Sequence, residues 1–298
     1  MTDAASVRVA APAKVNLFLR ILAKEESGYH QIETLYRAVD LCDEIVVHRT
    51  ERGVTVEVIG PSVGPDEENL AYRAADALLD AGRIKTGVHV HLTKNIPAGA
   101  GLGGGSSDAG ATLRALNTLL GQPFSTSALL QIAGPLGADV PFFASGVGCA
   151  LAWGRGERLV PIPDASVLPV LLALPSLHIS TAEAYDHVRV PECITPASLD
   201  LDALGRPETV AALAVNDFEA SVFGRHPELG ELREAMHEAG ALTARLSGSG
   251  AALFGLFSDR EAAGRARNSL SGSWGDVRFV VTETMTSQPE PVLSLASS

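Results

Sequence analysis

Cysteine and long apolar runs are both scarce in this chain of 298 residues. The three cysteines, at positions 42, 149 and 193, form no Cys-x-x-Cys pair, so they indicate neither a disulfide framework nor a zinc site. No apolar run approaches the ~20 residues that a membrane helix requires, so no membrane partner is expected. The first five residues lack the basic and apolar regions of a signal peptide. We therefore expect a cytoplasmic protein.

Positive charge is also in short supply. The chain has 23 lysines and arginines against 35 aspartates and glutamates, and the lysines are limited to positions 14, 24, 85 and 94. A general nucleic-acid binder needs an excess of cations to meet the phosphate backbone, so no nucleic-acid partner is expected. If the chain binds phosphate, it must use backbone amides and a few well-placed cations.

Glycine, in contrast, is concentrated in residues 94–108, with five glycines between positions 99 and 105. The alternating run at 88–92 predicts a strand before this stretch. Leucines at helical spacing predict a helix over 106–120 after it, with Ser106 or Ser107 as its cap. Glycines let the backbone approach a ligand closely, and the free N–H groups of a first helical turn favour an anion. This order of strand, loop and helix predicts a phosphate cradle.

Three phosphate-binding patterns and one structural alternative compete for this stretch. A Walker A loop needs a Gly-Lys pair, and the chain has none. Gly99, Gly101 and Gly104 match the dinucleotide fingerprint, but the segment after the helix, 125–133, predicts another helix where that fold needs a strand. The third pattern is Pro-x-x-x-Gly-Leu-Gly-x-x-Ser-Ser, which runs from 97 to 107. The alternative is a glycine-rich surface turn before an ordinary helix.

Two further candidates lie near the N-terminus. Lys14 and Asn16 are two residues apart on a predicted strand, so both side chains lie on one face and could converge on a ligand. A solvated strand face is the alternative. In the polar loop at 25–30, Tyr29 offers a stacking face and His30 a hydrogen-bonding edge, although an ordinary surface loop would explain this pair equally well.

Two turns complete the set of candidates. Asp139 lies in the turn Gly-Ala-Asp-Val-Pro, where it could act on a ligand or simply cap a short helix that begins near Pro141. The turn Ser-Gly-Ser-Gly at 247–250 is either a tight hairpin or a backbone surface pressed against a ligand bound between domains. The residues alone leave both questions open.

The order of predicted elements indicates an α+β protein of two domains, residues 1–160 and 161–285. The first domain has predicted strands at 7–11, 14–21, 32–39, 44–49, 54–59, 88–92 and 146–153, and helices at 69–80, 106–120 and 125–133. The second has predicted strands at 167–174, 243–246, 251–257 and 277–284, with helices at 180–185, in part of 208–223, at 227–239 and at 258–270. This second series suggests a sandwich of the split βαβ type. Residues 286–298 are rich in serine and proline, and we expect them to be disordered.

Five segments together resemble those of the GHMP kinases, with similarity over about residues 7–284. The segments are 12–19, 28–30, 102–108, 137–143 and 246–254. The resemblance implies an N-terminal domain like ribosomal protein S5 domain 2 and a ferredoxin-like C-terminal domain. It also implies a kinase that uses ATP and Mg²⁺ to phosphorylate a small alcohol. Segments 12–19 and 137–143 point to a subgroup whose substrate is a diphosphocytidyl ester of a branched sugar alcohol.

The resemblance assigns roles around the phosphoryl group. By similarity, Asp139 is the base that takes the hydroxyl proton, and Lys14 stabilises the developing charge. Mg²⁺ would be held by ATP phosphates rather than by dedicated protein ligands, with the Ser106 or Ser107 hydroxyl as the candidate exception. Asp108 is expected to face away from the phosphates. The predicted ATP-binding residues are Asn69, Lys94, Pro97, Ala98, Gly99, Ala100, Gly101, Leu102, Gly103, Gly104, Gly105, Ser106 and Ser107.

The resemblance also places the cytosine of the substrate between two aromatic rings, Tyr29 and Tyr185, with His30 at its edge. The predicted substrate-binding residues are Asn16, Tyr29, His30, Thr181, Tyr185, Gly248, Ser249 and Gly250. The expected partner is this small molecule alone, bound by a monomer or homodimer. Two alternatives remain: a kinase of the same family for another small alcohol, and a catalytically inert sensor that binds ATP and a ligand on the same scaffold.

Overall fold

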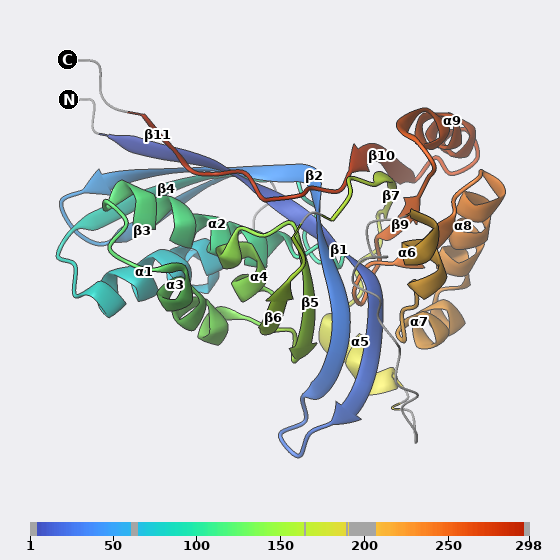
Figure 1. Ribbon diagram of the computed structural model, residues 1–298, viewed down its shortest axis with the longest axis horizontal. Coiled ribbons are helices and arrows are strands. Elements are labelled where there is room, and N and C mark those ends of the chain that lie inside the picture. The colour runs from blue at the N-terminus through green and yellow to red at the C-terminus, as the bar shows by residue number, and fades with distance from the viewer. Residues whose placement is uncertain (1–4, 61–64, 164, 189, 191–206, 295–298) are drawn as a thin grey trace.

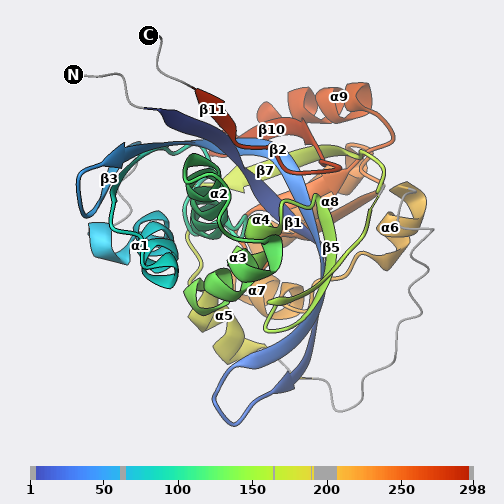
Figure 2. The same cartoon turned by 60° about the vertical axis from the view of Figure 1, so that its left-hand side comes forward.

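The fold is taken from a computed structural model, which describes residues 5–60, 65–163, 165–188, 190 and 207–294 (Figure 1). The strands form two β-sheets, one built from residues 6–161 together with 292–294 and the other from residues 169–283. Figure 2 shows the hairpin of β1 (Ser6–Lys24) and β2 (His30–Thr50) extending well beyond the other strands of the first sheet, on the side of α5 (Thr181–His187). Within the described part of the chain, no helix is both long and apolar enough to cross a membrane.

The first sheet has seven strands and is built on two long ones. Its order is β11 (Val292–Ser294), β1 (Ser6–Lys24), β2 (His30–Thr50), β4 (Gly87–Thr93) and β3 (Val54–Ile59), with β5 (Cys149–Gly154) and β6 (Arg158–Pro161) on a branch from β2. The two strands predicted around Pro12 are one strand with a register shift between Pro12 and Ala13. A proline cannot donate to the ladder, so a bulge at this point absorbs it without ending the strand.

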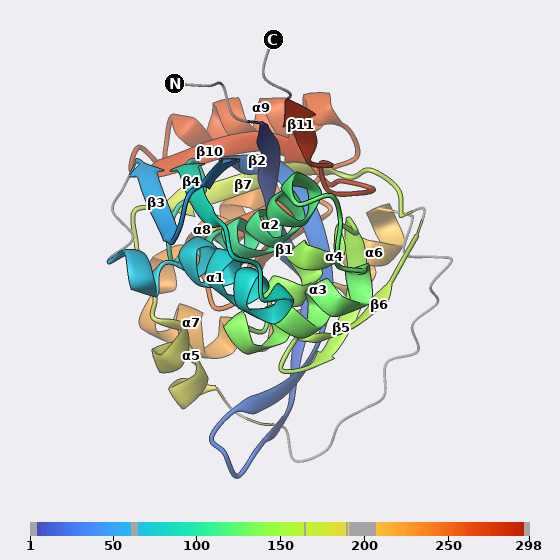
Figure 3. The same cartoon turned by 90° about the vertical axis from the view of Figure 1, so that its left-hand side faces the viewer.

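Helices cover one face of this sheet, as Figure 3 shows from the side of β3. They are α1 (Leu70–Gly82), α2 (Gly104–Leu119), α3 (Thr126–Ala133) and α4 (Val140–Ser145), with 3₁₀ turns η1 (Asp66–Glu68) and η2 (Gly134–Leu136). Ile45 and Val47 of β2 pack with Val88 and Val90 of β4 into the core beneath these helices. Because side chains alternate along a strand, the residues between them face the opposite, uncovered side of the sheet.

The second sheet has the order β10 (Val277–Glu283), β7 (Pro169–Pro175), β9 (Leu253–Leu256) and β8 (Thr243–Leu246), with every neighbouring pair antiparallel. Strand β9 therefore lies between β7 and β8, which is the predicted split βαβ arrangement. The helices of this half are α5 (Thr181–His187), α6 (Pro207–Leu213), α7 (Glu219–Arg225), α8 (Pro227–Glu238) and α9 (Arg260–Ser271).

Direct hydrogen bonds join the two halves along β1 and β2. The Leu19 N–H donates to the Val215 carbonyl, and the Ile21 N–H donates to the Asp217 carboxylate. On β2 the guanidinium of Arg37, which is 1% exposed, donates to the carbonyls of Ala165 and Ser166 in the connecting segment. These bonds fix the position of β1, and with it Lys14, relative to the C-terminal half.

The C-terminal segment is ordered through Ser294, so the prediction of a disordered tail was wrong for residues 286–294. Strand β11 pairs with β1, and Gln288 is 2% exposed, where its amide donates to the carbonyls of Phe142 and Val147. The open edge of β1 gives this short polar segment a partner that its own composition does not reveal. Residues 295–298 lie outside the described part of the chain.

We expect Gln288→Ala to lower the free energy of unfolding by about 1–3 kcal/mol, because it removes two hydrogen bonds of a buried amide. The Val147 carbonyl loses this donor, while the Phe142 carbonyl keeps the Ser145 hydroxyl. Urea unfolding of wild type and variant would measure the loss. Gln131→Ala, which changes an exposed glutamine on α3, is the control and should stay within about 0.5 kcal/mol of wild type. Equal stability of all three proteins would contradict the structural role of Gln288.

Candidate active site

A cleft of about 1090 Å³ lies between the two halves and collects most of the predicted site residues. Its walls come from β1 and β2, the glycine loop, the turn before α4, helix α5 and the turn after β8. The predicted residues that line it are Lys14, Asn16, Tyr29, His30, Asn69, Lys94, Pro97, Ala98, Gly99, Ala100, Gly101, Gly103, Gly104, Gly105, Ser106, Asp139, Thr181, Tyr185, Gly248 and Ser249. Residues far apart in the sequence are thus brought to one cavity.

Three predicted residues stand apart from the lining. Leu102 is 1% exposed and packs in the core. The backbone of Gly250 packs closely against the side chain of Leu246. Ser107 is fully buried, and its hydroxyl donates to the Pro12 carbonyl at 2.7 Å. Its assignment as a ligand of phosphate or Mg²⁺ was therefore wrong, because the hydroxyl is used to tie α2 to β1.

The glycine loop leads directly into the N-terminus of α2. Gly99, Gly101 and Gly103 all have positive φ angles, and Gly103 is the N-cap. The helix therefore begins at Gly104, two residues before the predicted serine cap at Ser106. The N-cap position has a left-handed backbone, which glycine adopts readily and serine does not. The first N–H groups of the helix face the cleft beside Ser106, as an anion site requires.

Lys14 lies at the centre of the cleft wall, with 4% of its surface exposed. Its ammonium donates to the Asn16 side-chain oxygen at 2.7 Å and to the Gly101 carbonyl at 2.9 Å, and its Nζ lies 3.6 Å from Asp139 Oδ2. Burial lowers the pKa of Lys14, while Asp139 acts in the opposite direction. The lysine is therefore held against the phosphate loop with one carboxylate as its counter-charge.

Asp139 does not cap α4, because its side chain makes no hydrogen bond to the helix backbone. Instead the Tyr36 hydroxyl donates to Asp139 Oδ1 at 2.7 Å, which leaves Oδ2 toward Lys14. Burial, and secondly the charge of Asp139, keep the pKa of Tyr36 well above its ordinary value. Sequence reasoning missed Tyr36, since only the β1–β2 register places it opposite Asn16.

Lys94 has a structural role that the sequence did not indicate. Its ammonium lies between the carboxylates of Asp43 and Asp108, at 2.6 Å from Asp108. Asp43 also accepts the N–H groups of Asn95 and Ile96, so this cluster fixes the entry to the glycine loop. Asp108 lines the cleft rather than facing away from it, and the adjacent lysine compensates its charge.

Burial raises the pKa of the Asp108 carboxyl to about 8, with Lys94 opposing the shift. A folded-state pKa above the ordinary value of about 3.9 means that folding takes up a proton between about pH 4 and pH 8, so stability falls as pH rises through that window. We expect Asp108→Asn to reduce this fall. Between about pH 5 and pH 8, the free energy of unfolding of the variant should drop by at least about 1 kcal/mol less than that of wild type.

Urea unfolding at the two pH values would measure this difference. The control is Asp76→Asn, which neutralises an exposed aspartate of α1 and should keep the wild-type slope. Parallel pH dependences for wild type and Asp108→Asn would show that this carboxyl is already ionised in the folded protein at neutral pH.

Aromatic and polar side chains form the far end of the cleft. Tyr29 is 58% exposed, and the Arg155 guanidinium lies 3.9 Å from the centre of its ring. His30 stacks on Tyr185 with ring centres 4.8 Å apart, and Tyr185 also meets Phe218 edge-on. His30 therefore covers one face of a ring predicted to stack on cytosine. Arg155 and Phe218 were missed because the sequence carries no motif for them.

Two polar groups complete the lining. The hydroxyls of Thr181 on α5 and Ser249 in the turn after β8 form a hydrogen bond of 3.1 Å. Asn69 caps α1 by accepting the Ala71 N–H at 2.9 Å, so its side-chain NH₂ remains for the cleft. The site therefore combines three parts. The anion cradle suits a nucleotide phosphate, the lysine–carboxylate pair suits a reacting hydroxyl, and the aromatic end suits a nucleobase.

Comparisons with known proteins agree with this arrangement. The N-terminal domain model of the GHMP kinases matches residues 69–147, and the C-terminal model matches residues 197–276. A 4-diphosphocytidyl-2-C-methyl-D-erythritol kinase from Synechococcus sp. (strain JA-3-3Ab) is 39% identical over 92% of this chain and 92% of its own length. One from Geobacter sp. (strain M21) is 40% identical over 90% of this chain and 96% of its own.

Solved structures give the same answer for the fold. The crystal structure of a 4-(cytidine 5′-diphospho)-2C-methyl-D-erythritol kinase superposes with a TM-score of 0.79 at 39% identity, over 93% of this chain and 99% of that one. A homoserine kinase from Cytophaga hutchinsonii shares the fold, with a TM-score of 0.76 at 22% identity over 97% of each chain. The chain therefore belongs to the GHMP kinase family, in the group of the 4-diphosphocytidyl-2-C-methyl-D-erythritol kinases.

Proposed function

We propose that this enzyme transfers the γ-phosphoryl group of ATP to the 2-hydroxyl of 4-diphosphocytidyl-2-C-methyl-D-erythritol, a step in the non-mevalonate synthesis of isoprenoid precursors. The products are the 2-phosphate and ADP. The observation that carries the proposal is the Lys14–Asp139 pair, 3.6 Å apart and beside the glycine loop in one cleft. The names of the relatives supply the substrate, and the site supplies groups suited to its chemistry.

The acceptor is a tertiary alcohol, whose proton must leave as the new P–O bond forms. Asp139 Oδ2 is the acceptor for that proton, since Oδ1 already receives the Tyr36 hydroxyl. Lys14 has two of its N–H donors committed to Asn16 and Gly101. Its third N–H can meet Asp139 or an oxygen of the transferring phosphoryl group, where it stabilises the developing negative charge.

The glycine loop and the N-terminus of α2 would hold the ATP phosphates through backbone N–H groups. The Mg²⁺ that accompanies ATP neutralises phosphate charge when bound. Of the two predicted serines, Ser106 fits as its protein contact, because it lines the cleft while the Ser107 hydroxyl is engaged with Pro12. Magnesium dependence, a cytoplasmic location and a monomeric or homodimeric state all stay predictions.

The aromatic end of the cleft would bind the cytidine. Tyr29 is exposed enough to stack on a base, with Arg155 on its ring. His30 occupies one face of the Tyr185 ring, so cytosine stacks on that face when His30 gives up its own stack, after which the imidazole can reach the edge of the nucleobase. This end is what distinguishes a diphosphocytidyl substrate from mevalonate or homoserine, which carry no base.

A substrate panel tests the proposal. ADP release would be followed with ATP and Mg²⁺ and, in turn, the diphosphocytidyl alcohol, mevalonate and homoserine. We expect turnover with the first substrate alone. Turnover with another alcohol would replace the substrate assignment, and binding of ATP without turnover on any alcohol would favour the sensor alternative.

A further inference from the structure

Three histidines gather on the face of the first sheet that the helices leave uncovered, and none of the three lines the cleft. His89 and His91 alternate with core residues along β4, so both point away from the helices. His48 of β2 pairs with His89 in the strand register, and Glu57 of β3 pairs with His91. The sequence predicts only a strand at residues 88–92, and none of these side chains lines the cleft, so the proposed kinase function leaves the cluster unexplained.

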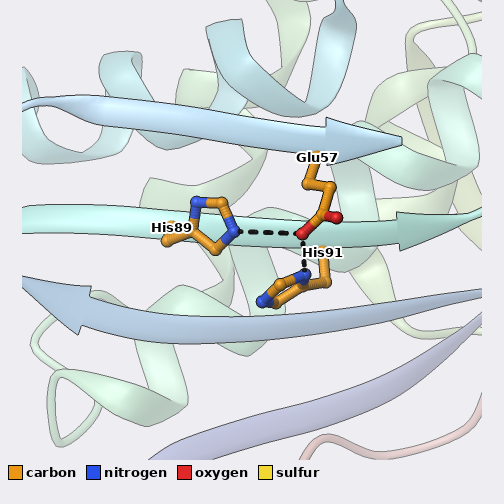
Figure 4. A group of neighbouring side chains, drawn as sticks. All are labelled: Glu57, His89 and His91. Atoms are coloured by element: carbon orange, nitrogen blue, oxygen red, sulfur yellow. Dashed lines mark ion pairs between the residues drawn. The ribbon is translucent and has the colours of Figure 1, made fainter. Parts of the chain in front are cut away.

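The ligand atoms of Glu57, His89 and His91 all lie within 4.8 Å of one another. Figure 4 shows both imidazoles beside the carboxylate of Glu57. Glu57 Oε2 is 2.8 Å from His91 Nδ1 and 3.8 Å from His89 Nε2. Across the described residues, this is the one group of three or more such side chains within that distance. Ligands of a tetrahedral Zn²⁺, at about 2.0–2.2 Å from the ion, are roughly 3.4 Å from one another, so small side-chain rotations suffice.

A second observation concerns the orientation of His89. Its Nδ1 is within hydrogen-bonding distance of the Thr55 hydroxyl, at 2.7 Å, which directs Nε2 toward Glu57. Histidines that bind metals are characteristically oriented by such a bond to the other ring nitrogen. The His48 ring meets His91 edge-on at 5.4 Å and closes the cluster on the β2 side. The three ligands therefore stand on two hydrogen-bonded strands, β3 and β4, which hold them in place.

We propose that Glu57, His89 and His91 form a binding site for a divalent transition-metal ion of the zinc type, with water as the fourth ligand. Two imidazoles and a carboxylate suit Zn²⁺, Co²⁺ or Ni²⁺, whereas Mg²⁺ prefers oxygen ligands alone. The ion would link β4 to β3 and stabilise the folded chain by mass action. The site is independent of the proposed phosphoryl transfer, and its test does not require activity.

The test is calorimetric titration of the tag-free protein with Zn²⁺, repeated with Co²⁺ to record the absorption of a tetrahedral site. We expect one ion per chain and a higher melting temperature with Zn²⁺ present. His91→Ala and Glu57→Gln should each weaken Zn²⁺ binding by at least about 10-fold, since even the loss of an outer-shell partner costs about that much. Excess Mg²⁺ should not compete.

His226→Ala is the matched control, because His226 forms another histidine–carboxylate pair, with Glu228 at 3.4 Å, far away on α8. This variant should bind Zn²⁺ as tightly as wild type. The proposal is overturned if wild type binds less than one ion per chain, if Glu57→Gln and His91→Ala both keep wild-type affinity, or if Mg²⁺ displaces Zn²⁺ at equal concentration. Because Glu57 is exposed, Glu57→Gln will fold even if a histidine variant does not.

Discussion

Asp139→Asn is expected to lower kcat by about 10²–10⁴-fold, the usual contribution of a positioned general base. The amide keeps the shape of the carboxylate and can still accept the Tyr36 hydroxyl, but it cannot take the proton of the substrate. The variant also removes the counter-charge that opposes the lowered pKa of Lys14. Lys14 will therefore lose its proton at lower pH, and the alkaline limit of the remaining activity should shift down.

The measurement is steady-state ADP release across a pH series, with ATP binding followed separately by calorimetry. ATP should still bind, because the phosphate loop is unchanged. Tyr36→Phe is the matched control, because it removes the hydrogen bond to Asp139 while the aromatic ring keeps its packing on Phe142. Its loss in kcat should be much smaller. An Asp139→Asn enzyme within about 10-fold of wild type would exclude Asp139 as the base.

The second large effect is expected at Gly101. Its φ of +77° lies in the left-handed region, and a Cβ at this position would come within 2.0 Å of the Ser247 carbonyl oxygen. The Gly101 carbonyl also accepts from Lys14 and from the Ser247 hydroxyl. The glycine loop and the 247–250 turn are thus pressed backbone to backbone. The turn lies in the connection between the antiparallel strands β8 and β9, as a hairpin requires, and its contact with a ligand stays a prediction.

Gly101→Ala should therefore force the loop away from the turn. We expect kcat/KM to fall by about 10²-fold, because a shift of about 1 Å in a positioning element has that effect. The left-handed backbone alone adds about 1–2 kcal/mol of destabilisation. Kinetics and urea unfolding would measure both.

Gly264→Ala is the control, since this helical glycine has no neighbour within 4 Å and lies on α9. It should leave activity near wild type and raise the free energy of unfolding by about 0.5–1 kcal/mol, because alanine is the better helix former. If Gly101→Ala had the kinetics of wild type, the loop would tolerate displacement. The close contact between Gly101 and Ser247 would then not be needed for activity.

Much of the fold and the cleft could be predicted from local patterns and from the resemblance. The strand before the glycine loop and the split βαβ order follow from local sequence patterns. The pairing of Lys14 with Asp139 was implied by the resemblance to the GHMP kinases alone. Tyr36 could not be predicted, because its contact with Asp139 depends on the register of β1 against β2 and on the path of the turn before α4.

The errors have a common physical cause. The sequence suggests Ser107 as a cap or a phosphate ligand, but its hydroxyl donates to the Pro12 carbonyl. The role of Lys94 in ATP binding stays a prediction, and its ion pairs with Asp43 and Asp108 could not be foreseen from the sequence. The tail from 286 to 294 acquires order from the edge of β1 and from the hydrogen bonds of Gln288 to Phe142 and Val147. In each case a partner distant in sequence decides what a polar residue does.

Proton-coupled ³¹P spectroscopy of the reaction product tests the central claim most directly. Carbon 2 of the methylerythritol bears no hydrogen, so phosphorylation of its hydroxyl gives a new monoester resonance without splitting by protons. We predict this singlet, formed together with ADP and absent with Asp139→Asn at equal enzyme and time. A new triplet or doublet would place the phosphate on a primary or secondary hydroxyl and contradict the account, as would ADP formation with no new monoester.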